Sequence, residues 1–300
     1  MRPFTDAPGF TDDFFAVREF LVRLNADRVR TPGFLWARWE WAFALPFLDT
    51  ASLGRIGVWE RAGGVVGLVT FEEAPGDAWI VVDPAHRDLL PAMVDHAVER
   101  LSVEGRVRVL VPDDDEELAT LVERRGLART GDGEPNAVLD LRGELRYELP
   151  AGFSVAGLDE EWDLRAFHRL LHRGFGHPGE PDWSPSELGW RERSTASPGQ
   201  RADLQVLVRT PDSGYAAFAG VWWWPGAAYA MVEPVCADPD WRGRGCGRAA
   251  VLEAVRRARD LGAERAYVGS GQEFYRRLGF VPTAGGVWWA LGSGQVRQSG

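Results

Sequence analysis

The stretch from Arg242 to Arg248 has the composition of an anion-binding turn. It reads RGRGCGR, and an apolar-periodic segment follows it. Glycine lets the backbone adopt positive φ and approach a ligand closely, and the N–H groups that open a helix favour phosphate. Arginine adds charge-assisted contacts to phosphate oxygens. The predicted phosphate-binding residues are Arg242, Gly243, Arg244, Gly245, Cys246, Gly247 and Arg248.

The elements around this turn narrow the choice of ligand. The apolar run 228–237 predicts a strand before the turn, and an i, i+3, i+4, i+7 stripe of apolar residues from Val251 predicts a helix after it. On the polar side of this helix we expect Glu253 and Arg257 to pair in contact with solvent.

Two common phosphate sites do not fit this arrangement. A dinucleotide site would place the glycines directly after the strand and an acidic residue at the end of the next one, yet residues 238–242 intervene and the next strand ends in Val268-Gly269. A P-loop needs lysine, and all 34 basic residues are arginine. The absence of lysine also excludes Schiff-base and kinase-type chemistry, and no G-x-S-x-G motif is present. The pyrophosphate of coenzyme A is the remaining candidate.

The turn resembles the signature of the GNAT acetyltransferase superfamily. That signature, Gln/Arg-x-x-Gly-x-Gly/Ala, opens the helix after the fourth strand, and residues 242–247 match it in full; FYRRLGF, 274–280, is similar to the family's later tyrosine motif. The resemblance covers residues 150 to 292. It implies acetyl-CoA as co-substrate, N-acetyltransferase activity, and an α/β fold in which helices flank a mixed, mostly antiparallel sheet. The alternative for the glycines is a tight structural turn.

The resemblance also assigns roles within the site. It places Val235, Cys236 and Ala237 along the pantetheine arm and matches Tyr275 to the residue that protonates the leaving thiolate. Glu233 stands in the apolar run YAMVEPV, where burial would raise its pKa towards that of a general base for the amine. The alternatives are a packing tyrosine and a strand-end carboxylate paired to an arginine.

The two cysteines, Cys236 and Cys246, offer a second mechanism through an acyl-cysteine. Neither has a histidine or another base beside it in the sequence, so we favour direct transfer to the amine. Two cysteines without nearby ligands also predict no metal site.

The segment 83–97 begins like the stretch from Asp238 but lacks glycine. Asp83, Pro84 and Arg87 match Asp238, Pro239 and Arg242 at one constant offset, which indicates a duplication. In the first copy the glycine positions hold Asp88, Leu89, Leu90 and Pro91, which remove the predicted phosphate site. We therefore predict two tandem domains: a degenerate GNAT-like domain over 1–148 and an acetyl-CoA-binding GNAT domain over 149–300. The first shapes a substrate cleft or is a vestigial scaffold.

The acceptor is less defined than the cofactor. The Gly/Pro-rich loop 174–185, in the region where the family shapes its acceptor pockets, is the expected place of substrate selection. His168, His172 and His177 are interpreted as surface or packing residues, and His177 as an alternative lining of the pocket. A small-molecule amine and a protein amine both remain open.

Composition excludes several partners. A formal net charge of −10 argues against general nucleic-acid binding, and no apolar run approaches the ~18 residues of a membrane span. The first residues, MRPFTDAPGF, lack the pattern of a signal peptide, so we expect a cytoplasmic protein. The alternative function is a non-catalytic acyl-CoA-binding or sensing protein.

Overall fold

The computed structural model describes residues 1–5, 7–160 and 162–291. Their contacts form two compact units, one of residues 1–136 with 283–291 and one of residues 137–282. Among the described helices, none is long and apolar enough to cross a bilayer.

The first unit is built on a mixed sheet with strand order β1-β2-β3-β4-β5-β12-β6. The strand pairs β1–β2, β2–β3, β3–β4 and β5–β12 are antiparallel, whereas β4 and β5 are parallel. A helical crossover connects β4 to β5, as parallel neighbours require. The strands are β1 (Arg2–Pro3), β2 (Gly57–Arg61), β3 (Gly64–Thr70), β4 (Asp77–Val82), β5 (Val107–Pro112), β6 (Ala128–Asp140) and β12 (Val281–Leu291).

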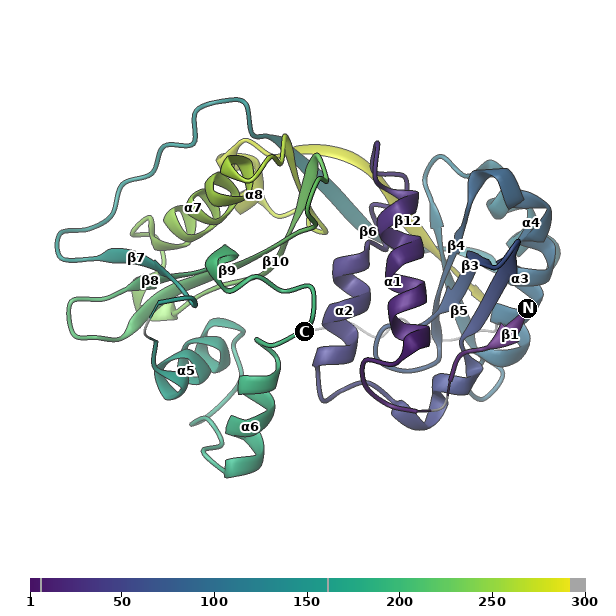
Figure 1. Cartoon of the computed structure of the whole chain (residues 1–300), viewed down its shortest axis with the longest axis horizontal. Helices are drawn as coiled ribbons and strands as arrows, with labels where there is room; N and C mark the ends of the chain where they lie inside the picture. Colours follow the sequence, from purple (N-terminus) through teal and green to yellow (C-terminus); the bar gives the residue numbers. More distant parts are fainter. Residues whose placement is uncertain (6, 161, 292–300) are drawn as a thin grey trace. The chain divides into compact units, whose positions relative to one another are not determined.

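Helices cover both faces of this sheet (Figure 1). α1 and α2 lie on one face, and α3 and α4 lie on the other. Thr11 and Asp115 cap the first and the last of them through their side-chain oxygens. The tryptophans of α2, Trp36 and Trp39, are each 1% exposed, so they pack in the core. The helices are α1 (Asp12–Leu24), α2 (Trp36–Ala44), α3 (Leu90–Arg100) and α4 (Glu116–Arg124).

The second unit repeats this plan with strand order β6-β11-β10-β9-β8-β7. The strand pairs β6–β11, β10–β9, β9–β8 and β8–β7 are antiparallel, whereas β10 and β11 are parallel. The α/β class and the mostly antiparallel sheet of the sequence prediction are thus confirmed. The strands that belong to this unit alone are β7 (Ser154–Gly157), β8 (Gln205–Arg209), β9 (Tyr215–Trp223), β10 (Tyr229–Ala237) and β11 (Arg265–Val268).

The helices of the second unit form two layers. α7 and α8 cover one face of the sheet, and α5 and α6 lie on the opposite side (Figure 1). Two buried clusters correspond to these layers, because one joins α7 and α8 to the sheet and the other joins α5 to β8, β9 and β10. The helices are α5 (Leu164–Gly174), α6 (Pro185–Arg193), α7 (Cys246–Asp260) and α8 (Glu273–Leu278).

Two strands missing from the sequence prediction, β6 and β12, explain why the units do not end at residue 148. Residues 137–140 of β6 pair with β11 in the second unit, and residues 286–291 of β12 pair with β5 in the first. The chain therefore passes twice from one unit to the other. The assignment of 1–148 as a degenerate domain and of 149–300 as the acetyl-CoA-binding domain stays a prediction.

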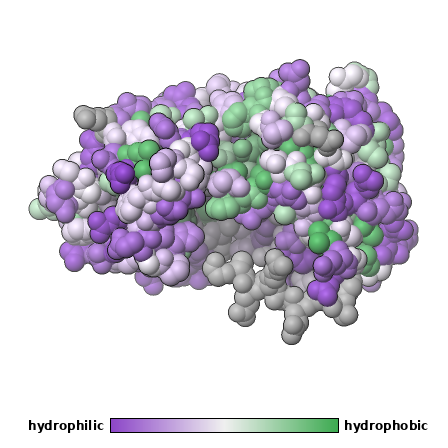
Figure 2. Space-filling view, turned by 90° about the horizontal axis from the view of Figure 1, so that it is seen from below, coloured by the Kyte–Doolittle hydropathy of each residue, from purple (hydrophilic) through white to green (hydrophobic). Residues whose placement is uncertain are grey.

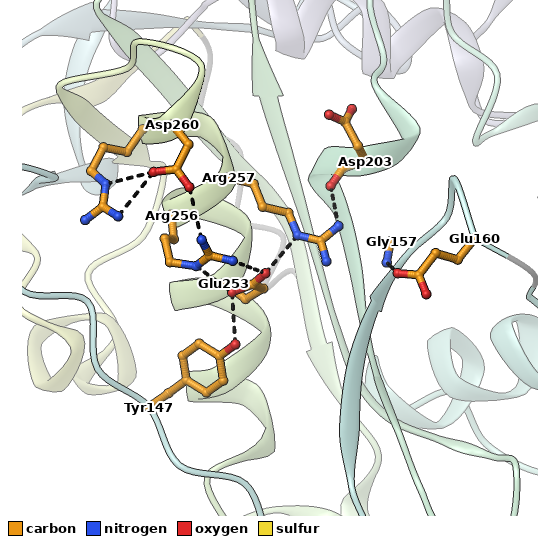
Figure 3. A network of polar contacts seen from close by, with 9 residues as sticks. Tyr147, Gly157, Glu160, Asp203, Glu253, Arg256, Arg257 and Asp260 are labelled. Carbon is orange, nitrogen blue, oxygen red and sulfur yellow. Dashed lines mark hydrogen bonds and ion pairs between the residues drawn. The ribbon is translucent and has the colours of Figure 1, made fainter.

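The polar side of α7 differs from the sequence prediction. Glu253 is not exposed to solvent but buried, with 3% of its surface accessible. Figure 3 shows why, because Tyr147 of the segment between β6 and β7 lies against α7 and donates its hydroxyl to Glu253 Oε2 over 2.9 Å. Leu145, Tyr147 and Leu149 of this segment pack on the core beneath α7. The predicted pair with Arg257 exists, but as a buried contact.

The carboxylate of Glu253 collects a set of donors. Arg256 donates to it over 2.7 and 2.8 Å, and Arg257 Nε donates over 2.9 Å. Burial alone would raise the pKa of Glu253, but the hydrogen bonds from Arg256, Arg257 and Tyr147 lower this pKa from 4.5 to about 2. Arg257 also donates to the carbonyl of Asp203, so the network fixes α7 to the chain before β8 (Figure 3).

Replacing Glu253 by glutamine should destabilise the protein in a pH-dependent way. Because the folded-state pKa is depressed, the ionised carboxylate contributes about 3 kcal/mol above pH 5, and this contribution is lost as the pH falls towards 2. Urea denaturation should give a difference between wild type and Glu253→Gln of about 2–3 kcal/mol at pH 7 and a smaller one at pH 3. Glu264→Gln, at an exposed position, is the control. A difference independent of pH would contradict this role.

Candidate functional site

The parallel pairing of β10 with β11 ends early. The register joins Tyr229–Met231 to Arg265–Tyr267, whereas β10 continues to Ala237 along its other neighbour, β9. From Val232 to Ala237, β10 is therefore not paired with β11. The residues expected along the pantetheine arm, Val235, Cys236 and Ala237, lie in this divergent part.

A bulge in β10 marks the point of divergence. Val232 pairs with Val221 and Val235 pairs with Ala219, so β10 has one residue more than β9 between these pairs. The bulge contains Glu233 and Pro234, and a proline cannot donate to a strand ladder. A local change in β10 therefore interrupts its pairing.

Two residues of β9 hold the bulge in place. Trp222 donates its indole Nε1–H to the carbonyl of Glu233 over 2.8 Å. Gly220 makes room for the same carbonyl, because a Cβ on it would lie 2.6 Å from that oxygen and 2.7 Å from Oε1 of Gln205. The sequence analysis did not single out Gly220, although a glycine within an apolar strand is a signal for close backbone approach.

The glycine turn forms the backbone conformation that the sequence predicts. Gly243 and Gly245 have φ of +74° and +86°, and Gly245 is the N-cap of the 15-residue helix α7. No side chain caps this helix end. The amides of Cys246, Gly247 and Arg248 open the helix without acceptors inside it, and a Cβ on Gly243 would meet nothing within 4 Å. The turn therefore presents main-chain donors next to open space.

The three arginines of the turn have different surroundings. Arg242 donates to the carbonyls of Ala237 and Gly174 over 3.2 and 2.9 Å. Arg248 donates to the carbonyls of Arg146 and Arg277. Arg244 is exposed and its guanidinium lies 5.0 Å over the ring of Trp241. Arg242 and Arg248 thus stabilise the chain around the turn, whereas the exposed Arg244 stacks on Trp241.

The corresponding turn of the first unit has another structure. A 3-10 helix, Pro84–Leu89, leads into α3, whose N-cap Leu89 is in the right-handed helical region and whose first turn contains Pro91. The β4 and β5 register also ends early, at Trp79 and Leu110. The first unit therefore has the strand divergence but not the glycine turn.

Glu233 and Tyr275, predicted from distant parts of the sequence, act on each other electrostatically. Tyr275 of α8 is 8% exposed, and its ring contacts Phe274 and Phe280. Burial raises the pKa of Tyr275, and the negative charge of Glu233 raises it further. The phenol is consequently neutral at pH 7. Glu233 is half-buried.

Both cysteine thiols are poor nucleophiles in this environment. Burial raises the pKa of Cys236 to about 12, and it also raises the pKa of Cys246. The nucleophile is the thiolate, which is scarce at neutral pH when the pKa is raised. Neither cysteine is therefore set up to form an acyl-enzyme.

The histidines of the expected acceptor region bind main-chain carbonyls. His168 Nε2 lies 3.1 Å from the carbonyl of Asp182, and His172 Nε2 lies 3.1 Å from that of Gly179. His168 is 4% exposed, and burial lowers its pKa. His177 packs against the ring of His172, with centroids 5.4 Å apart. These contacts fix the loop between α5 and α6 and agree with the interpretation of the three histidines as surface or packing residues, while the alternative of His177 as a lining of the acceptor pocket stays a prediction.

One buried residue of this region has no signal in the sequence. Arg191 of α6 is only 9% exposed, although it lies in the polar run RERS. The sequence analysis did not single it out. The packing of α6, rather than any local pattern, buries it.

Comparison with protein families gives one match. Residues 202–282 match the family described as "Acetyltransferase (GNAT) domain". This segment contains the divergent strand, the glycine turn and Tyr275. No curated protein sequence matches the chain.

Solved structures resemble the whole chain. A tandem GNAT protein from the clavulanic acid biosynthesis pathway is 14% identical, with a TM-score of 0.63, and 99% of each chain is covered. A GCN5-related N-acetyltransferase from Sphaerobacter thermophilus is 16% identical, with a TM-score of 0.58 over 96% of this chain and 94% of that one. FemX is 12% identical, with a TM-score of 0.59 over 92% and 95%. At these identities the likeness concerns the fold.

Substituting Gly220 by alanine should disturb the bulge. The added Cβ would press on the carbonyl of Glu233 at 2.6 Å, and relief requires the backbone of β9 or β10 to shift. We expect a loss of about 1–3 kcal/mol in the free energy of unfolding, measured by urea denaturation. Gly64→Ala in β3 is the matched control, because a Cβ there would meet nothing within 4 Å and should change stability by less than about 0.5 kcal/mol. Equal stability of the two variants would show that the close approach does not constrain the bulge.

Proposed function

We propose that the chain transfers the acetyl group of acetyl-CoA to an amine, carried by a small molecule or by a protein, and the match of residues 202–282 to the GNAT acetyltransferase family supports this. One observation carries the proposal: the β10 and β11 register ends at Met231 and Tyr267, and β10 then leads into a glycine turn that opens α7. This arrangement offers a main-chain edge for an extended ligand and main-chain amides for its phosphates.

The residues of the turn suit a pyrophosphate. Amides at a helix N-terminus with no side-chain cap favour an anion, and the open space at Gly243 permits close approach. Arg244 adds charge at the exposed side of the turn. Val235, Cys236 and Ala237 would line the pantetheine arm. The co-substrate supplies a thioester, an activated acetyl group that an amine can attack.

Glu233 is the proposed proton acceptor. An alkyl ammonium group has a pKa of ~10.4, so the attacking amine must lose a proton that a base takes directly or through water. The carboxylate stands in the bulge, next to the first residues of the divergent edge. Its main chain is held by Trp222, which favours a defined position for the carboxylate.

Tyr275 is the proposed proton donor. As the new C–N bond forms and the C–S bond breaks, the sulfur leaves as a thiolate whose pKa is ~8.5. A neutral phenol can protonate it, and the raised pKa keeps Tyr275 neutral over the working range. From the neutral amine, the proton that the nitrogen loses goes to Glu233 and the proton that the sulfur gains comes from Tyr275, so the reaction balances once Glu233 returns one proton to the Tyr275 phenolate through water. An acceptor that arrives as an ammonium ion first releases one further proton to solvent.

A non-catalytic acyl-CoA sensor is the second candidate. Such a protein would need the glycine turn but neither acid nor base, and the electrostatic coupling of Glu233 with Tyr275 favours the enzyme. The first unit lacks the glycine turn, and we assign it no acetyl-CoA site.

Gly245→Glu tests the phosphate site. A carboxylate beside the α7 amides would repel phosphate, and the dissociation constant of acetyl-CoA in calorimetry should rise at least roughly tenfold. Gly262→Glu is the control, since Gly262 also has positive φ but follows the C-terminal end of the same helix. If both variants weaken acetyl-CoA binding equally, backbone strain accounts for the effect. Unchanged acetyl-CoA binding in Gly245→Glu would overturn the assignment of the phosphate site.

Tyr275→Phe and Glu233→Gln test the chemistry. Each should lower kcat by about a hundredfold while the acetyl-CoA dissociation constant stays within about twofold. The assay is mass spectrometry of an amine panel incubated with acetyl-CoA, followed by rates on the best substrate. Tight acetyl-CoA binding by the wild type without any acetylated amine would favour the sensor. Wild-type kcat in either variant would remove that residue from the mechanism.

A further inference from the structure

Arg191 is a buried cation without a carboxylate partner among the described residues. Within the part of the chain that the structure describes, its side chain makes one hydrogen bond, from Nε to Nδ1 of His168 over 3.4 Å, and its guanidinium lies 4.0 Å over the ring of Trp190. A guanidinium has five N–H donors, so most of its donor capacity is not used by these contacts. Buried charges in proteins are normally paired. The terminal nitrogens of Arg191 are not among the buried side-chain atoms that lack a hydrogen-bond partner, so the shortage concerns a carboxylate partner and not buried donors.

The nearest carboxylate does not neutralise the charge of Arg191. Glu187 of the same helix acts on it electrostatically but forms no ion pair with it, and the Glu187 carboxylate accepts a hydrogen bond from Trp190 Nε1. Burial lowers the pKa of Arg191 to about 10. The group is therefore still protonated at neutral pH, and it is less favourably solvated than an exposed arginine.

The position of Arg191 connects it to the divergent strand. Burial raises the pKa of the Cys236 thiol, and the positive charge of Arg191 lowers it. The helix between them, α5, rests directly on Cys236, because a Cβ on Gly174 would lie 2.8 Å from the Cβ of Cys236. α5 therefore connects Arg191, through His168, to the residue that follows Val235 on the strand edge.

Arg191 does not belong to the polar exterior of α6. Its neighbours Glu192 and Arg193 are exposed, whereas Arg191 is buried. Figure 2, which shows the molecule from below the view of Figure 1, has mainly hydrophilic atoms over the left part, where α5 and α6 lie. A cation that serves only solubility would lie on this exterior.

We propose, resting on the proposed acetyl transfer, that the acceptor is an amine that also carries a carboxylate, and that Arg191 binds this carboxylate. The planar guanidinium matches a carboxylate through two parallel N–H···O bonds. His168 accepts from Nε and so orients the guanidinium while its terminal nitrogens remain for the ligand. The pair would fix one end of the acceptor while its amine meets Glu233.

The charge favours a carboxylate over a phosphate. Arg191 offers one positive charge, and its hydrogen-bond partner His168 is neutral at pH 7 because burial lowers the pKa of the imidazole. A carboxylate carries one negative charge, whereas a phosphate monoester carries nearly two at pH 7. A phosphorylated amine is therefore a competing outcome of the test rather than the proposal.

The test compares matched ligands on the whole protein saturated with coenzyme A. The probes are α-, β- and γ-amino acids and aminobenzoates, each with its own carboxamide, together with amino-alkyl phosphates. Calorimetry should show at least one acid bound at least tenfold more tightly than its amide. In Arg191→Gln this preference should fall below threefold, and Arg191→Lys should restore part of it. Arg193→Gln, the exposed arginine of the same helix, should keep it.

Binding and turnover separate this proposal from the proposed function. Equal binding of every acid and its amide, tighter binding of the phosphates, or a preference that survives in Arg191→Gln would overturn the carboxylate site. The wild-type comparison of acids with their amides tests the site even if Arg191→Gln does not fold. Two other results would instead count against the proposed acetyl transfer. One is that the wild type does not bind coenzyme A, and the other is that it binds acids more tightly than their amides but acetylates none of them.

Discussion

The candidate site depends on one interruption of strand pairing. β10 and β11 run side by side as a parallel pair only as far as Met231 and Tyr267, and beyond this point β9 is the one strand that pairs with β10 among the described residues. In this part of β10 the carbonyls of Glu233 and Ala237 accept from Trp222 and Arg242, and the other main-chain groups on the side of β11 lie outside its ladder, where a ligand could pair with them. The bulge at Glu233 and Pro234, accommodated by Gly220 and anchored by Trp222, sets the position of this change. The same bulge places a carboxylate at the start of the free edge.

A comparison of the two units shows that the interrupted strand pairing does not by itself create a turn with uncapped helix amides. The first unit also ends its parallel register early, at Trp79 and Leu110, yet its helix begins after a 3-10 turn with Leu89 in the helical region and with Pro91 in its first turn. In the second unit, Gly243 and Gly245 take positive φ and leave the first amides of α7 uncapped. A divergent strand offers an edge for a ligand, and only the glycine turn adds donors for its phosphates. Under the proposed function, two units of the same plan therefore hold one phosphate site instead of two.

Local backbone requirements were readable in the sequence, and long-range pairing was not. The glycines of the turn predicted residues with positive φ, and the apolar runs predicted strands such as β9 and β10. β6 and β12 were missed because their glycines and prolines are typical of turns. In the structure Gly133 and Gly285 instead allow close approach, since a Cβ on either would lie 2.5 Å from a carbonyl oxygen of the facing strand. Glu253 was placed in solvent because its helical periodicity is polar, and only the Tyr147 segment that covers it makes it buried. Arg191 likewise depends on how α6 packs, which no local pattern encodes.

The most direct measurement is hydrogen–deuterium exchange of the whole protein with and without coenzyme A, followed by mass spectrometry of peptides. If the free edge and the uncapped helix hold the ligand, protection should increase in peptides that contain 232–237 and 243–248. Peptides that contain 83–91, the matching region of the first unit, should exchange at an unchanged rate. Protection confined to 83–91, or no protection in either region at saturating coenzyme A, would contradict the account.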